Sequence, residues 1–277
     1  MKIMLYGEIV SDEWEWVYSL FQIPHCCPKQ VREAIEQLPA GEDLILEINS
    51  PGGDVWAGFE IFGLLQACSA HTEAHIIALA ASAATTVCSG CDTVLASPVA
   101  QIMIHQPSAF VDDYMNNDAT RQLQNFLDSV KASIINGYVV KSGGKATRRA
   151  FEKLVDQSTY MPVQDAMDLG LVDGLLDADD ELQDAITAAG GVVVKNAAGA
   201  SLVPKALLER YEAAVRAGTM EEVPGHPVTK EAAQALSGAP LAASGAPANL
   251  ADDAGTVNNR VTDWRLQAAI DLERVRA

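Results

Sequence analysis

Two copies of one local pattern, a buried strand followed at once by a tight turn and a helix, restrict the folds that this chain can adopt. The first strand is predicted over residues 44–49, a nearly continuous apolar and β-branched run that ends in a Ser-Pro-Gly-Gly turn at residues 50–53. The second strand is predicted over residues 75–80 and passes directly into a helix that begins at or just after Ser82. Repeated strand-helix-strand units predict an α/β fold with a mostly parallel sheet and helices packed on it.

Shorter strands and one long helix follow this repeated pattern. The long helix is predicted over residues 118–142, where apolar residues recur at steps of three and four before Gly143 and Gly144. We also predict strands at 92–96 and 101–105, helices at 147–155 and 163–169, and an end of the ordered core at 170–174.

The distribution of apolar residues predicts one core. They make up 49% of the chain and are concentrated before about residue 177, whereas Ala, Gly and Pro dominate later stretches. We therefore expect one domain over residues 1–177 and a C-terminal extension over residues 178–277. The extension is predicted to hold a helix at 205–217, a flexible linker at about 224–260 and a short amphipathic helix after Thr262.

The net charge excludes one class of partner. Because 37 Asp and Glu residues outnumber 19 Lys and Arg residues, the formal charge is −18, which argues against binding to nucleic acid. The electrostatic field of this negative charge favours a basic partner or a basic substrate segment. Neither a signal peptide nor an apolar run of about 20 residues is apparent, so we expect a cytoplasmic protein without a membrane partner.

The five cysteines are an odd number scattered through apolar segments, which favours reduced thiols over a disulfide framework. Cys88 and Cys91 have the spacing of a redox motif or half of a zinc site, but no second pair of this kind exists. We interpret them as small buried side chains. No metal or other cofactor is expected.

Three features in turn positions suit acyl transfer, which needs a nucleophile, a base and donors to an oxyanion. Ser82 lies between Ala pairs at a predicted strand-to-helix junction, where the helix start presents free N–H groups. Gly53 can expose a backbone N–H in the same way as Ala83 at the helix start, giving two oxyanion donors. His105 ends a strand in which alternation places it with Met103 on an available face, opposite the core.

Four segments, in this order and at this spacing, closely resemble the signature blocks of the Clp protease proteolytic subunit family: Ile-Asn-Ser-Pro-Gly-Gly at 48–53, Ala-Ala-Ser-Ala at 80–83, Met-Ile-His-Gln-Pro at 103–107 and Gly-Leu-Val-Asp at 170–173. The resemblance covers about residues 2–177 and is strongest to the phage branch, the head maturation proteases. It implies the repeated βαβ spiral of Clp and crotonase proteins with a long protruding helix, followed here by a largely irregular tail.

By this resemblance Ser82 matches the nucleophile, His105 the base, and Gly53 with Ala83 the oxyanion donors. The third triad position departs from the family, because Ser158 stands where Asp, or Glu in phage-like members, is usual. Two interpretations remain: Asp156, two residues earlier, reaches the imidazole after a small loop shift, or the Ser158 hydroxyl orients it. A hydroxyl can fix the tautomer but does not offset the imidazolium charge.

The resemblance implies a serine endopeptidase that acts on protein or peptide substrates, during phage assembly on scaffold or capsid proteins. It also implies a ring-forming homo-oligomer. Because nothing in this chain resembles a phosphate-binding loop, any ATP-driven unfolding would have to come from a separate ATPase. Two alternatives are a catalytically weak assembly module and, less favoured, a crotonase-type acyl-CoA enzyme. The tail is either a linker that ends in a docking helix or a segment that the enzyme removes itself.

Overall fold

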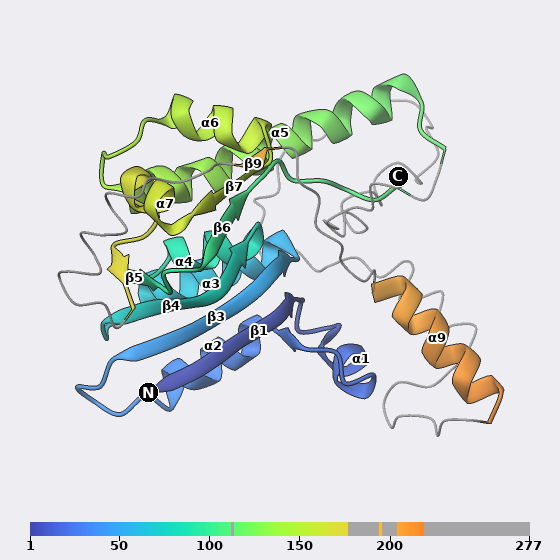
Figure 1. The fold of residues 1–277 in the computed structure, drawn as a ribbon. Coiled ribbons are helices and arrows are strands. Elements are labelled where there is room, and N and C mark those ends of the chain that lie inside the picture. The colour runs from blue at the N-terminus through green and yellow to red at the C-terminus, as the bar shows by residue number, and fades with distance from the viewer. Residues whose placement is uncertain (112–113, 177–193, 196–203, 219–277) are drawn as a thin grey trace, which may run out of the picture.

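A single mixed sheet organises the computed structural model, which describes residues 1–111, 114–176, 194–195 and 204–218. The strands in spatial order are β2 (His25–Cys26), β1 (Lys2–Ile9), β3 (Leu44–Gly53), β4 (Thr72–Ala81), β6 (Gln101–Ile104), β7 (Thr159–Pro162) and β9 (Val194–Lys195) (Figure 1). Away from this path, β5 (Thr93–Ala96) pairs with β4 and with β8 (Gly174–Leu175).

The sheet is parallel from β2 to β6, as the repeated pattern predicts. β4 divides its pairing: its first half is bonded to β5 and its last residues to β6. β7 and β9 run antiparallel to their neighbours, which the sequence pattern did not indicate. The mostly parallel α/β architecture is therefore confirmed, with an antiparallel edge added.

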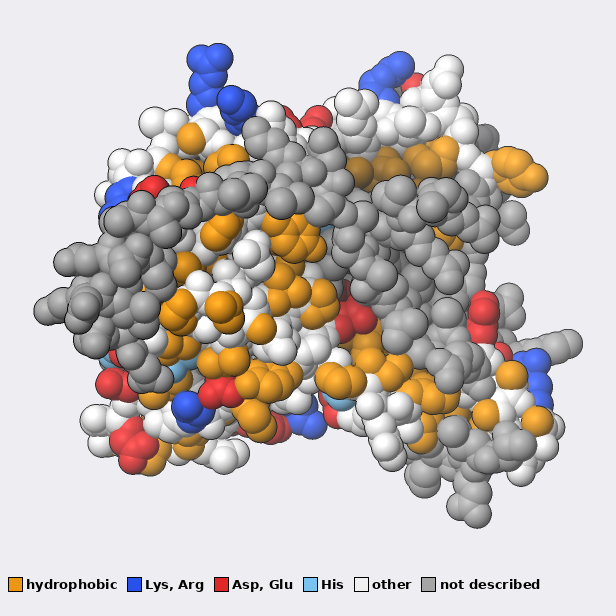
Figure 2. Space-filling view, in the orientation of Figure 1, with side chains coloured by type: hydrophobic (Ala, Val, Ile, Leu, Met, Phe, Trp, Pro, Cys, Tyr) orange, Lys and Arg blue, Asp and Glu red, His pale blue; other side chains and the backbone are white. Residues whose placement is uncertain are grey.

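Helices cover one face of the sheet. α2 (Pro28–Glu36), α3 (Val55–Ala67) and α4 (Ala83–Ser89) lie behind β1, β3 and β4 in Figure 1, and α5 (Asn117–Ser142), α6 (Arg148–Asp156) and α7 (Val163–Leu169) lie near β6 and β7. The other face is left open over β1 and β4, where Met4 and Ile77 are exposed and hydrophobic side chains are visible between polar ones (Figure 2).

The predicted helices are confirmed closely. The long helix begins after Asn116, whose side chain accepts a hydrogen bond from the N–H of Ala119, and ends at Gly143, which adopts a left-handed conformation. Thr147 caps α6 in the same way through the N–H of Ala150. Helical periodicity placed the boundaries of both helices within one residue, and the capping side chains account for where each helix begins.

Two details of the predicted strands are wrong. β3 does not end before the glycines but runs through Gly53, which pairs with Ile9. An added Cβ on Gly53 would lie 2.1 Å from the carbonyl oxygen of Ile9, so only glycine permits this close pairing. Met103 is not on an available face, because β6 is buried on both sides and Met103 is only 1% exposed.

Part of the C-terminal extension packs on the domain. α9 (Pro204–Arg216) confirms the helix predicted over 205–217, and its Tyr211 ring meets Trp16 of α1 (Glu15–Leu20) edge to face, with centroids 5.3 Å apart. Figure 1 shows α9 beside α1 and away from the sheet. The boundary at 177, the linker at about 224–260 and the last helix lie outside the described residues.

The end of the core is tied to α5 by one buried cation. The Lys141 ammonium donates to the Asp173 carboxylate at 2.7 Å and to the carbonyl of Asp92 at 3.0 Å. The same carboxylate accepts a hydrogen bond from the N–H of Val94.

Across the described ranges, no helix has the length and apolar character that crossing a membrane requires.

Candidate active site

Ser82 occupies the sharp junction between β4 and α4. Its backbone has φ 56° and ψ −121°, an uncommon conformation for a residue with a side chain. The neighbouring strand β6 holds this junction, because the Ser82 N–H donates a hydrogen bond to the carbonyl of Met103 at 2.8 Å. Thr85 Oγ1 lies 2.8 Å from the carbonyl oxygens of both Ala80 and Met103. These contacts fix the strained backbone that carries the Ser82 hydroxyl.

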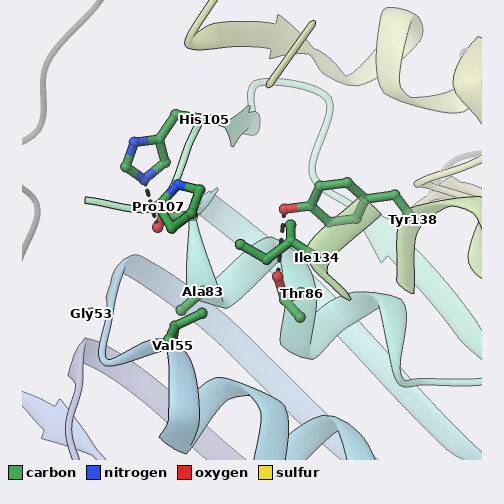
Figure 3. A pocket seen from close by; sticks show the side chains of 9 residues that line it. Gly53, Val55, Ala83, Thr86, His105, Pro107, Ile134 and Tyr138 are labelled. Carbon is green, nitrogen blue, oxygen red and sulfur yellow. Dashed lines mark hydrogen bonds between the residues drawn. The ribbon is translucent and has the colours of Figure 1, made fainter. Parts of the chain in front are cut away.

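His105 meets Ser82 directly, with Nε2 2.7 Å from Oγ. The imidazole follows the last residue of β6 and points toward the Ser82 hydroxyl in Figure 3. Burial lowers the pKa of His105 to about 4, so the ring is neutral near pH 7. A neutral Nε2 can accept the Ser82 hydroxyl proton, and the predicted spatial pairing of the two side chains is therefore present.

Glycines at the end of β3 allow its backbone to approach this pair. An added Cβ on Gly52 would lie 2.5 Å from the carbonyl oxygen of Ala81 and 3.0 Å from the nitrogen of Ala83. Gly52 and Gly53 have φ 94° and 148°, which residues with side chains rarely adopt. Gly53 and Ala83 line the same pocket as Ser82 and His105.

The rest of the pocket is mostly apolar. Val55 and Pro107 form part of its wall, and α5 contributes Ile134 and Tyr138 from the opposite side (Figure 3). The Tyr138 hydroxyl lies 3.5 Å from the hydroxyl of Thr86, and burial raises the pKa of Tyr138. Helical spacing alone did not indicate that the α5 residues line a pocket, since the spacing is the same whether they face a core or a pocket.

Asp156 is engaged away from the imidazole. Its carboxylate accepts hydrogen bonds from the Lys131 ammonium and, at 2.7 Å, from the Gln106 side-chain amide. The bond with Lys131, followed by that with Gln106, lowers the pKa of Asp156. Among the described residues, no carboxylate is hydrogen-bonded to the ring of His105.

Ser158 directly precedes β7. β6 and β7 pair in antiparallel register up to Ile104 opposite Thr159, and His105 and Ser158 each lie one residue beyond this last pair. Ser158 has φ 45°, and its N–H donates to the carbonyl of Val155 at 3.1 Å. The position that resembles the third triad site thus lies beyond the same end of the β6–β7 pairing as His105, in a left-handed backbone conformation.

The Cys88 and Cys91 side chains are buried, as predicted, and belong to the hydrophobic core. Burial raises the pKa of Cys88 to about 12 and that of Cys91 well above its ordinary value. Burial raises the pKa of Cys26 to about 12 as well. These three thiols are therefore protonated and unreactive near neutral pH.

The chain is similar in sequence to known proteins. The family model described as Clp protease matches residues 32–179. The ATP-dependent Clp protease proteolytic subunit 1 of Chlamydia muridarum is 34% identical over 159 residues, which span 53% of this chain and 80% of that protein. The corresponding subunit of Chlamydia pneumoniae is 31% identical over 61% of this chain and 92% of its own length.

A solved structure has the same fold. The ClpP1 N165D mutant from Listeria monocytogenes superimposes with a TM-score of 0.52, covering 65% of this chain and 94% of that one at 21% identity. At this identity the likeness concerns the fold alone.

Proposed function

Because this chain belongs to the Clp protease family, whose proteolytic subunits are serine-type peptidases, we propose that it is a serine endopeptidase with Ser82 as its nucleophile. The observation that carries the proposal is the 2.7 Å contact between Ser82 Oγ and His105 Nε2 in a pocket that Gly53 and Ala83 also line. The strained backbone at Ser82 supports it, since strain of this kind is maintained mainly where function requires it.

In the proposed reaction, Nε2 of His105 takes the Ser82 proton as Oγ attacks the scissile carbonyl carbon. The N–H groups of Gly53 and Ala83 bind the resulting oxyanion. The imidazolium then gives its proton to the leaving amine, and the C–N bond breaks to leave an acyl-Ser82. Water, deprotonated by the same Nε2, hydrolyses this ester and restores Ser82.

Orientation of the base is the part of the proposal that departs from the family. Nε2 acts as a base only when the ring proton is on Nδ1, which therefore needs an acceptor. Of the two residues that the sequence offers, Asp156 is occupied by Lys131 and Gln106, which favours Ser158. A hydroxyl acceptor leaves the imidazolium charge uncompensated, so we expect acylation to be slow relative to an Asp-containing site; replacing the Asp of a related triad cost about 10⁴ in turnover.

A fluorophosphonate probe tests the nucleophile directly. Wild-type protein should become labelled at Ser82, and Ser82→Ala and His105→Ala should not. The peptide that carries the label is identified by mass spectrometry after digestion. Equal labelling of wild type and Ser82→Ala would end the proposal.

The non-catalytic alternative, a Clp-like module that acts only in assembly, is favoured by one observation: the described residues place no carboxylate on His105. It predicts a folded wild-type protein that the probe does not label. The same measurement therefore separates the two functions.

For the biological role, we propose processing of scaffold or capsid proteins in phage or prophage head maturation, in the cytoplasm. The signature blocks that resemble the phage branch support it, and a charge of −18 suits attraction of basic substrate segments. We also propose a ring-like homo-oligomer and, for any unfolding step, a separate ATPase. Intact mass of full-length wild type against Ser82→Ala tests whether residues 178–277 are removed by self-cleavage, and light scattering tests the assembly.

A further inference from the structure

We propose that Lys131, Asp156 and Gln106 form a clamp that positions the His105 segment against Ser82. The inference rests on the proposed function, because it concerns how that base is held. It assigns Asp156 a positioning role through Gln106 and not a direct contact with the imidazole.

The clamp begins where the strand ladder ends. Pairing of β6 with β7 ends at Ile104, and the carbonyl of Met103 is fixed by the Ser82 N–H at 2.8 Å. His105 lies just past this anchored strand end. The side chain of the next residue, Gln106, donates to Asp156 at 2.7 Å, so the segment is held again immediately after the base.

Asp156 is placed where a carboxylate is unfavourable without a cation. It is the last residue of α6, and the C-terminal end of a helix carries partial negative charge. Lys131 offsets this with a direct ion pair to the same oxygen that accepts from Gln106. The Lys131 side chain is partly buried, at 22% exposed, and the Asp156 side chain is exposed, at 45%. A solvent-accessible ion pair of this kind contributes little to the free energy of unfolding. This favours a role in positioning the His105 segment.

The cation of the clamp and the wall of the pocket share one helix face. Lys131, Ile134 and Tyr138 follow one another on α5 at steps of three and four, and the last two line the pocket beside Ser82. A single rigid helix therefore fixes both the clamp and the pocket wall. Displacement of α5 would move the base segment relative to the nucleophile.

Single and combined substitutions test the clamp, with kcat and KM measured on a fluorogenic peptide. Gln106→Ala and Lys131→Met should each lower kcat about tenfold with KM little changed, because a small misplacement of the base affects the chemical step. The double variant should be no slower than the slower single variant, since both act through Asp156. Lys131→Arg should retain wild-type kcat. Arg121→Met, which removes an exposed cation from the same helix, serves as the matched control.

Three results would overturn the clamp. One is wild-type kcat in both single variants. Another is a loss of kcat in the double variant that equals the product of the losses in the two single variants. The third is an Asp156→Asn variant without activity together with a Lys131→Met variant of wild-type activity. This result would mean that Asp156 contacts the base directly.

A readout that does not depend on turnover keeps the inference separate from the proposed function. NMR titration of the His105 ring should give a pKa near 4 in wild type. In Gln106→Ala and Lys131→Met it should rise toward the ordinary value of about 6.5, as the released segment exposes the ring. Failure of the probe to label wild type would end the peptidase proposal while this titration still tests the clamp. An unchanged pKa in folded variants would overturn the clamp.

Discussion

Oγ of Ser82 and Nε2 of His105 lie 2.7 Å apart although 23 positions separate them in the chain. They meet because β4 and β6 pair in parallel, from Leu79 with Gln101 to Ala81 with Met103, and so end at the same edge of the sheet. Gly53, the last residue of β3, lies at the same edge of the sheet. Ligand and catalytic sites of open α/β sheets commonly lie outside the carboxyl ends of the strands.

The depressed pKa of His105 predicts an unusual pH dependence of acylation. The base acts only when neutral, and burial lowers its pKa to about 4. The rate of Ser82 labelling by a fluorophosphonate should therefore stay constant from pH 8 down to about pH 5 and fall with a midpoint near 4. Initial rates across this range, with folding followed by circular dichroism, provide the measurement. A midpoint near the ordinary histidine value of about 6.5 would contradict the prediction.

The same group predicts a loss of stability in mild acid. Below about pH 6.5 the unfolded chain binds a proton on this histidine, whereas the native ring stays neutral until about pH 4. Protons bound only by the unfolded state lower the free energy of unfolding as pH falls through this window. The full effect is at most about 3 kcal/mol, from 1.36 kcal/mol for each pKa unit.

Urea denaturation at pH 7, 6, 5 and 4.5 measures this slope. His105→Asn lacks the titrating group and should show a smaller decline than wild type over the same range. Parallel curves for the two proteins would assign the acid sensitivity to other groups.

Close backbone approach at the end of β3 predicts a strict requirement for glycine. A methyl group on Gly53 would meet the carbonyl of Ile9 at 2.1 Å, and its φ of 148° disfavours any side chain. Gly53→Ala should destabilise the protein by about 2–4 kcal/mol and abolish labelling of Ser82. Thermal melting and the probe assay measure both effects.

Gly63→Ala is the matched control for this prediction. Gly63 lies inside α3, where an added Cβ meets nothing within 4 Å. This change should raise stability by about 0.5–1 kcal/mol, as expected for Gly to Ala inside a helix, and should leave labelling intact. A Gly53→Ala protein that is as stable and as reactive as this control would refute the requirement.

Local patterns predicted the elements, and the resemblance to the Clp protease family added the Ser82–His105 pair, but neither indicated the contacts that surround them. The caps of α5 depend on residues close in sequence, so short segments encode them, whereas the junction at Ser82 is also held by Met103 of the neighbouring strand. Strand alternation failed at Met103, because a strand buried on both faces has no available side. The pairing of Lys131 with Asp156 joins two helices through side chains 25 positions apart, which no periodicity signals.

The residues of α5 that line the pocket indicate which substrate side chain is preferred on the acyl side of the cleaved bond. With Val55, Pro107 and Ile134 around the Ser82 hydroxyl, an apolar side chain should be favoured there over a charged one. Ile134→Ala should enlarge the pocket and raise kcat/KM for peptides with Phe at this position relative to Leu by about tenfold.

Ile135→Ala separates preference from stability in this test. Ile135 is buried in the core at 1% exposure and does not line the pocket. Both substitutions should cost about 2–4 kcal/mol of stability, since each removes a large buried side chain. Only Ile134→Ala should change the ratio of kcat/KM for the Phe and Leu peptides. The same ratio in both variants and in wild type would mean that the acyl-side residue does not bind against α5.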